Sequence, residues 1–141
     1  MGFKLKVTGA ENIDLGVENI TSVEFMTDTP DDSNARSTDL GTTLCITGKI
    51  LAAVGGAAAD DTLKLAKWSL VPAEKADCYR NVKVEVLAAS KVVREIELPN
   101  AFVVDYEEDY GDEEGVGQFK ILVKQKKDKM VDVKFEGGFD F

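Results

Sequence analysis

The sequence predicts a mainly β protein, an antiparallel β-barrel or sandwich of about eight strands with one α-helix. Segments that alternate apolar and charged residues with a period of two recur along the chain, as in half-buried strands. Only one segment has helical spacing. The chain has 141 residues, of which 44% are hydrophobic, which suits a sizeable core. Because no repeat and no linker divides it, we expect residues 1–141 to form a single domain.

The expected strands follow from this alternation and from the turn residues between them. They lie at residues 3–7, 20–26, 42–50, 82–86, 92–98, 101–107, 117–126 and 131–135. Pro99 and Asn100 favour a turn between two of them. Residues 101–107 and 117–126 could then form a hairpin.

The expected helix covers residues 60–71, DDTLKLAKWSLV. Its acidic start suits a helix N-terminus, and Pro72 stops it. Leu63, Ala66 and Leu70, with Trp68 as a further candidate, fall at helical spacing and predict the packed face.

A long polar connection, TDTPDDSNARSTDLG, separates the strands at 20–26 and 42–50. It spans residues 27–41, and Leu40 is its only sizeable apolar side chain. Connections of this length are usually functional or disordered.

Charge narrows the classes of partner. There are 26 acidic and 17 basic residues, a formal net charge of −9. Nucleic acids and anionic membrane surfaces attract basic proteins, so the sequence argues against both partners. No apolar run reaches the roughly 18 residues of a membrane span, and the first residues lack the apolar core of a secretory signal. We therefore expect a protein made in the cytoplasm.

The sequence offers little for catalysis or for cofactor binding. It has no histidine, which removes the commonest general base and transition-metal ligand. Cys45 and Cys78 are expected to be reduced, buried thiols rather than a disulfide. We expect no cofactor, no metal and no enzymatic activity. A hydrolase using Asp105, Asp109 or Glu113 is the remaining catalytic alternative.

Two charged clusters of opposite sign lie near the last strands. The stretch DYEEDYGDEE, residues 105–114, holds seven carboxylates, and KQKKDK, residues 124–129, holds four lysines. The acidic stretch could be a solvated hairpin end, a calcium site without the usual loop spacing, or a docking surface. In the hairpin described above the clusters would lie at opposite ends. They are then either two independent solvated turns or complementary ends of subunits stacked head to tail.

The order of these segments resembles a known family. A strand ending in SVEF is followed by the polar loop, the strand TTLCITGKI and the helix DDTLKLAKWSLV. Then come VKVEVLAASKVVREIELPNAFVVDY, a Gly-rich acidic gap and GVGQFKILVKQKK. From residue 17 to residue 127 this layout resembles the hemolysin-coregulated protein, Hcp, the inner tube protein of type VI secretion systems, and related contractile phage tail-tube proteins. The loop is less rich in Gly and Ser than in that family, lysines replace aromatic residues at the end of the last strand, and residues 130–141 are an extension.

The resemblance implies a barrel flanked by a helix, with six subunits in a ring and rings stacked into a tube. The protein would bind copies of itself, with sheath, baseplate or cargo proteins as further partners. It would assemble in the cytoplasm and could leave the cell within an injection particle. The alternative is a monomeric or dimeric adaptor or chaperone-like module of such an apparatus.

The resemblance also implies that the loop at residues 27–41 packs on a neighbouring subunit or ring. Arg36, its only basic residue, could form a local salt bridge or a bond across that boundary. The two terminal aromatic residues could pack on their own barrel or on the next subunit. The expected assembly residues are Asp28, Asp31, Asp32, Arg36, Asp39, Asp109, Asp112, Glu113, Lys124, Lys126, Lys127, Phe139 and Phe141.

Overall fold

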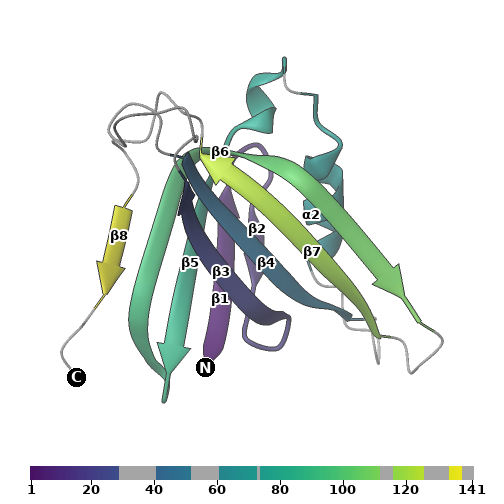
Figure 1. Ribbon diagram of the computed structural model, residues 1–141. Helices are drawn as coiled ribbons and strands as arrows, with labels where there is room; N and C mark the ends of the chain where they lie inside the picture. The colour runs from purple at the N-terminus through teal and green to yellow at the C-terminus, as the bar shows by residue number, and fades with distance from the viewer. Residues whose placement is uncertain (29–40, 52–60, 73, 112–115, 126–133, 138–141) are drawn as a thin grey trace.

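The computed structural model describes residues 1–28, 41–51, 61–72, 74–111, 116–125 and 134–137 (Figure 1). In these ranges the chain forms eight strands, one α-helix and one short 3-10 helix. The strands are β1 (Gly2–Thr8), β2 (Ile13–Leu15), β3 (Ile20–Asp28), β4 (Gly41–Leu51), β5 (Arg80–Ala88), β6 (Lys91–Tyr110), β7 (Val116–Gln125) and β8 (Lys134–Gly137). The helices are α2 (Thr62–Ser69) and η1 (Ala76–Cys78).

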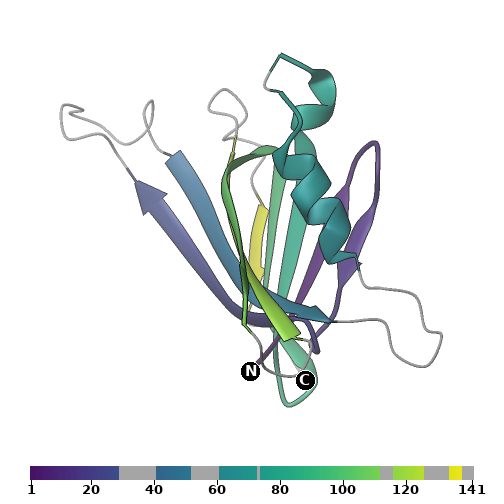
Figure 2. The same ribbon diagram turned by 90° about the vertical axis from the view of Figure 1, so that its right-hand side faces the viewer.

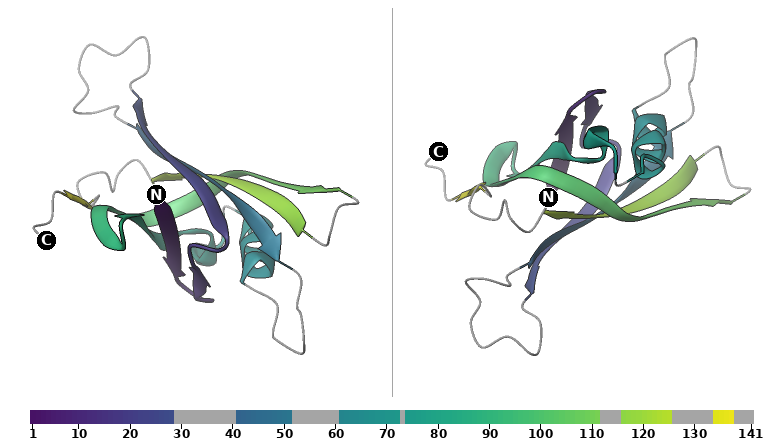
Figure 3. Two further views of the ribbon diagram at one scale, coloured as in Figure 1. Left: turned by 90° about the horizontal axis from the view of Figure 1, so that it is seen from below. Right: turned by 90° about the horizontal axis from the view of Figure 1, so that it is seen from above.

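All eight strands belong to one antiparallel sheet, in which seven follow the order β2-β1-β5-β6-β7-β4-β3 and β8 pairs with β6 off this path. The sheet curls on itself, since β3 at one end of this order also contacts β1 near the other end. The expected mainly β fold, barrel-like or sandwich-like with one α-helix, is confirmed. Figure 3 shows the arrangement from the two ends, with α2 beside the curved sheet.

The strand β6 belongs to both halves of this curled sheet. Residues 91–101 pair with β5, while residues 101–110 pair with β7 on the other side. The strand β8 pairs with residues 94–97 of β6. The expected turn at Pro99 and Asn100 is therefore wrong. The chain passes through it as a bulge, with Asn100 at a φ of 59° and a register shift opposite β5.

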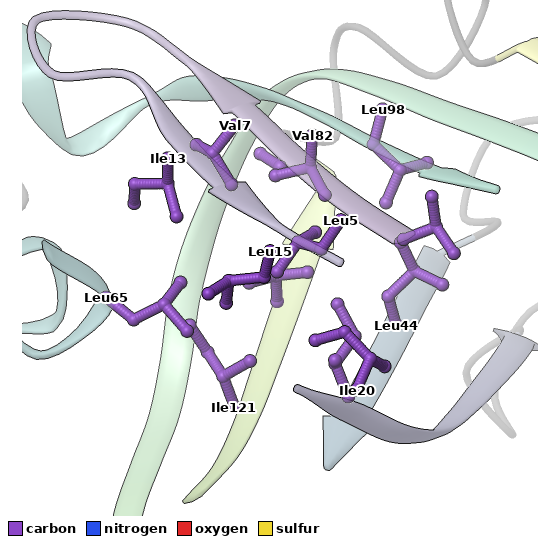
Figure 4. Close-up of a cluster of buried hydrophobic side chains, with 14 of the residues drawn as sticks. Leu5, Val7, Ile13, Leu15, Ile20, Leu44, Leu65, Val82, Leu98 and Ile121 are labelled. Atoms are coloured by element: carbon purple, nitrogen blue, oxygen red, sulfur yellow. The ribbon is translucent and has the colours of Figure 1, made fainter. Parts of the chain in front are cut away.

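The core fills the inside of the curl, because alternate residues of every long strand point inward. Figure 4 shows its centre, where five side chains converge from strands β1, β2, β4 and β7 and from helix α2. They are Leu5, Leu15, Leu44, Ile121 and Leu65. All of these side chains are almost fully buried. This packing explains why the period-two pattern of the sequence predicts the strands.

The helix α2 lies beside β2 and β6 (Figure 2), but its buried face differs from the expected one. The side chains of Thr62, Leu65 and Trp68 are buried, whereas Leu63 and Leu70 are 61% and 81% exposed. The expectation that Leu63 and Leu70 belong to the packed face is therefore wrong.

Polar contacts fix the helix in this orientation. The Trp68 indole N–H donates a hydrogen bond of 2.9 Å to the carbonyl oxygen of Cys78, and the Arg80 guanidinium lies 5.3 Å from the Trp68 ring centre. Arg80 also forms a 2.9 Å ion pair with Asp77. At the other end, Asp61 accepts a hydrogen bond from the backbone N–H of Asp14. Burial of the indole against these partners decides which face packs.

Candidate assembly and docking surfaces

The outward side of β3, β4, β7 and residues 101–110 of β6 forms a four-stranded surface, here called the outer face. Inward residues such as Leu44 and Ile46 are buried, so their neighbour Cys45 points outward. The strand registers place side chains in rows across the face. One such row is Glu24, Cys45, Leu122 and Asp105, one residue from each strand.

A groove of about 240 Å³ lies on this face, here called the outer groove. It is lined by Glu24, Met26, Cys45, Asp105, Glu107, Lys120 and Leu122. Met26 is 37% exposed and Leu122 is half-buried, so the groove combines an apolar floor with charged side chains.

Acid dominates the charge of this lining, with three carboxylates and one lysine. Lys120 lies opposite Glu107 in the pairing of β6 with β7. Within the described residues, the ion pairs join Lys64 to Asp61, Arg80 to Asp77 and Lys83 to Glu95, and none involves the groove. The negative charge of the groove is therefore not neutralised by contact with a cation in this part of the chain.

Both cysteines are free thiols, as expected, but they differ in accessibility. Cys78 is buried, and this burial raises the pKa of its thiol, while the nearby Arg80 charge partly opposes the shift. Cys45 is only half-buried and lines the outer groove. The expectation of two buried thiols is therefore wrong for Cys45.

Three of the residues expected at assembly contacts lie in the described ranges. Asp28 ends β3 and pairs with Gly41. Asp109 is exposed on β6 opposite Gln118, and Lys124 is exposed on β7 opposite Phe102. The other ten, from Asp31 to Phe141, lie outside the described residues.

The predicted hairpin of the segments around 101–107 and 117–126 is confirmed, although its first strand continues to Tyr110. Asp109 lies near the turn end and Lys124 near the opposite end, six residues apart along β7. At about 3.4 Å per residue this separation is roughly 20 Å, so these two charges do not meet within one subunit.

Strand β6 contains residues 105–110, so part of the acidic stretch lies within the sheet. Tyr106 and Tyr110 both donate hydrogen bonds from their hydroxyl groups to the Glu108 carboxylate. The bond from Tyr110 to Glu108 raises the pKa of Tyr110. Among the described residues, no three His, Cys, Asp or Glu side chains gather as a metal site would require. In the same ranges, no helix has the length and apolar character needed to cross a membrane.

The four-stranded half of the sheet has two edges within the described chain. One is β3, the terminal strand of the sheet order. The other is the stretch of β6 at residues 102–110, where β7 is the only described strand recorded as its partner. Val104, at the register shift of this stretch, is 45% exposed. Such edges are natural places for a further strand to pair.

Sequence reasoning missed most of the outer groove. Alternation within residues 20–26 and 42–50 is a signal that could have placed Glu24 and Cys45 away from the core, but Cys45 was expected to be a buried thiol. The registers of β4 with β3 and β7 could not be derived from one sequence, so the convergence of these residues with Leu122 and Asp105 was not predictable.

Comparison with known proteins supports the fold but not a sequence family. No protein-family model matches the chain, and no curated protein matches its sequence. Hcp1 from Flavobacterium johnsoniae aligns with a TM-score of 0.55 and 17% identity, over 98% of this chain and 99% of that chain.

Two further structures give similar alignments. A chain of the anti-feeding prophage (AFP) baseplate, 6-fold symmetrised, has a TM-score of 0.55 and 12% identity, over 96% of this chain and 93% of that chain. A mutant Hcp1 protein from the E. coli EAEC 042 pathovar has a TM-score of 0.54 and 10% identity, over 99% and 100% of the two chains. The curled antiparallel sheet with its flanking helix is therefore an Hcp-like fold.

Proposed function

We propose that this protein is a structural subunit that self-assembles into rings, and that the rings stack into the inner tube of a contractile injection, secretion or phage-tail-like apparatus. The observation that carries the proposal is the alignment with Hcp1 along nearly the whole of both chains. By the same likeness we propose six subunits in each ring. Such a protein works mechanically, so it needs no catalytic site.

The two sheet edges suggest how neighbouring subunits join. The edge of β3 in one subunit would pair beside residues 102–110 of β6 in the next. Because these edges differ, the contact is heterologous, and repeated rotation by the same angle closes a ring. The expected assembly residues outside the described ranges would then act between rings, or toward sheath, baseplate and cargo proteins. We propose assembly in the cytoplasm and delivery within the injection particle.

The first experiment measures the size of the particle, by light scattering on a sizing column with negative-stain images of the same peak. Rings or tubes are expected. A monomer of 15.3 kDa at high protein concentration, with no larger species, would contradict self-assembly of the protein alone.

A pair of variants tests the proposed lateral contact. Val104→Asp places a carboxylate on the β6 edge and is expected to reduce ring formation strongly, because the charge would be desolvated in the interface. Val17→Asp is the matched control, since Val17 is a similarly exposed valine, at 50% against 45% for Val104. Sizing chromatography should show rings for Val17→Asp only. Rings of equal yield from both variants would refute this edge as the contact.

One observation favours a second candidate function. One of the similar structures is described as a baseplate, 6-fold symmetrised. A subunit or adaptor of the baseplate would form rings without long stacks. Images of the ring fraction at rising protein concentration distinguish the two, because only the tube function predicts long stacked particles.

A further inference from the structure

We propose that the outer groove binds a cationic segment of a partner polypeptide, with lysine or arginine side chains seated between Glu24 on β3 and Asp105 and Glu107 on β6. This inference goes beyond the proposed function and does not require rings. It is based on the shape, floor and charge of the groove.

The floor of the groove suits the hydrocarbon stem of a long cationic side chain. Met26 and Leu122 supply apolar surface, and Cys45 lies between Glu24 and Leu122 in one row of the face. Lysine and arginine bury their stems on apolar surface while their charged ends stay near polar groups. An acidic or purely apolar segment would leave the groove carboxylates without partners.

The carboxylates lie on both sides of the floor. Glu24 and Asp105 are the two ends of the four-residue row, three strand spacings apart. At about 4.8 Å per spacing this gives a separation of roughly 14 Å. One cationic side chain cannot satisfy both ends. An extended segment lying across the strands would reach them with two cationic residues about four positions apart.

The β1–β2–β5 face of a second copy of this chain is a poorer occupant. A groove of about 220 Å³ on β1, β2 and β5 mixes three lysines with Asp14 and Glu85. One of those lysines, Lys83, already pairs with Glu95 at 3.1 Å. The positive charge of this second groove is therefore partly neutralised, so it matches the outer groove poorly.

The test uses a fluorescently labelled octalysine peptide and measures its binding by fluorescence anisotropy at low ionic strength. The groove variant carries Glu24→Gln, Asp105→Asn and Glu107→Gln. The control variant carries Glu11→Gln, Glu18→Gln and Glu74→Gln, which remove the same charge away from the outer groove. We expect octalysine to bind about tenfold more weakly to the groove variant and with unchanged affinity to the control variant.

A second readout locates the bound peptide. Cys45 is the accessible thiol of the described chain, so its alkylation by iodoacetamide, measured by peptide mass spectrometry, should slow when octalysine is added. Lys120→Gln should strengthen binding about twofold because it removes the one cation of the lining, whereas Lys67→Gln on α2 should have a smaller effect.

Three results would overturn the proposal. Equal losses in the groove and control variants would show that only net charge matters, and unprotected Cys45 would place the peptide elsewhere. Protection of Cys45 that grows with protein concentration without peptide would indicate a second copy in the groove. Sizing of the same samples separates this test from the proposed function, because rings without octalysine binding refute only the groove, and binding without rings refutes only the assembly.

Discussion

Gly48 on β4 has no room for a side chain. A Cβ atom built there would lie 2.5 Å from the ring of the buried Phe119 and 2.6 Å from the carbonyl oxygen of Asn19. Both neighbours are fixed, since Phe119 is in the core and this carbonyl accepts a hydrogen bond from the N–H of Lys49. The close packing of β4 against the β2–β3 connection therefore depends on glycine.

Gly48→Ala is expected to lower the free energy of unfolding by about 2 kcal/mol, as overpacking of a fixed core does. Gly117→Ala is the control, because its Cβ would meet the ring of the exposed Tyr110 at 3.1 Å, and that ring can move. The control should change stability by about 0.5 kcal/mol or less. Urea unfolding measures both variants, and equal losses would contradict the packing argument.

The pair formed by Lys83 and Glu95 links stability to pH. The hydrogen bond and charge of Glu95 raise the pKa of Lys83 above its ordinary value. A raised folded-state pKa means that the stabilisation is complete below the unfolded pKa of lysine and is lost as pH rises through the folded pKa.

A double-mutant cycle with Lys83→Met and Glu95→Gln tests this linkage. We expect a coupling energy of at most about 1 kcal/mol near neutral pH, because both side chains are partly exposed, and a smaller value in strongly alkaline solution. Urea unfolding of the four proteins at each pH supplies the measurement. A coupling that grows with pH would reverse the assigned sign.

At the scale of single residues, burial was easier to predict than contact. The alternation of residues 82–86 correctly indicated that Val82 and Val84 face the core. The helix was harder, because its apolar residues outnumber the positions on one face. The contacts of Trp68 with Cys78 and Arg80, which select that face, depend on residues ten or more positions away and leave no local pattern.

Among the elements, β6 depends on the bulge at Pro99 and Asn100. These residues face one residue of β5, Asn81, and Asn100 adopts a left-handed φ of 59°. Asparagine tolerates this conformation, whereas β-branched residues do not. The turn signal in the sequence was therefore a real local signal, but the strand continues because both of its halves find partners.

Substitutions at Asn100 test this account of the bulge. Asn100→Val should lower the free energy of unfolding by roughly 1–2 kcal/mol, while Asn100→Gly should be tolerated because glycine adopts positive φ without strain. Chemical unfolding with circular dichroism measures both variants. A tolerated valine together with a destabilising glycine would show that the backbone conformation is not the limiting factor.

For the whole molecule, the fold was predictable because strand patterns and the segment order extend over most of the chain. The sites were less predictable. The outer groove depends on registers between strands that are far apart in sequence, such as β3 and β7 on either side of β4. Most of the assembly residues chosen from charge lie outside the described ranges, and their role stays a prediction.

Salt tests the idea that the acidic and lysine clusters meet between stacked rings. Exposed charges are screened within about 10 Å at 0.1 M salt and within about 3 Å at 1 M salt. Tubes imaged by negative stain should therefore shorten as salt rises across this range. The rings themselves should persist, since backbone hydrogen bonds would hold their lateral contacts. Tube lengths that do not change with salt would contradict electrostatic stacking.

The path of β6 gives the molecule a mechanical property. Its 20 residues extend over roughly 65 Å and are shared by both halves of the curled sheet. A pull between the two ends of this strand would load the hydrogen bonds to β5 and β7 in shear, so that many must break together. We therefore expect high resistance to stretching along this strand, a property that the proposed tube function would require.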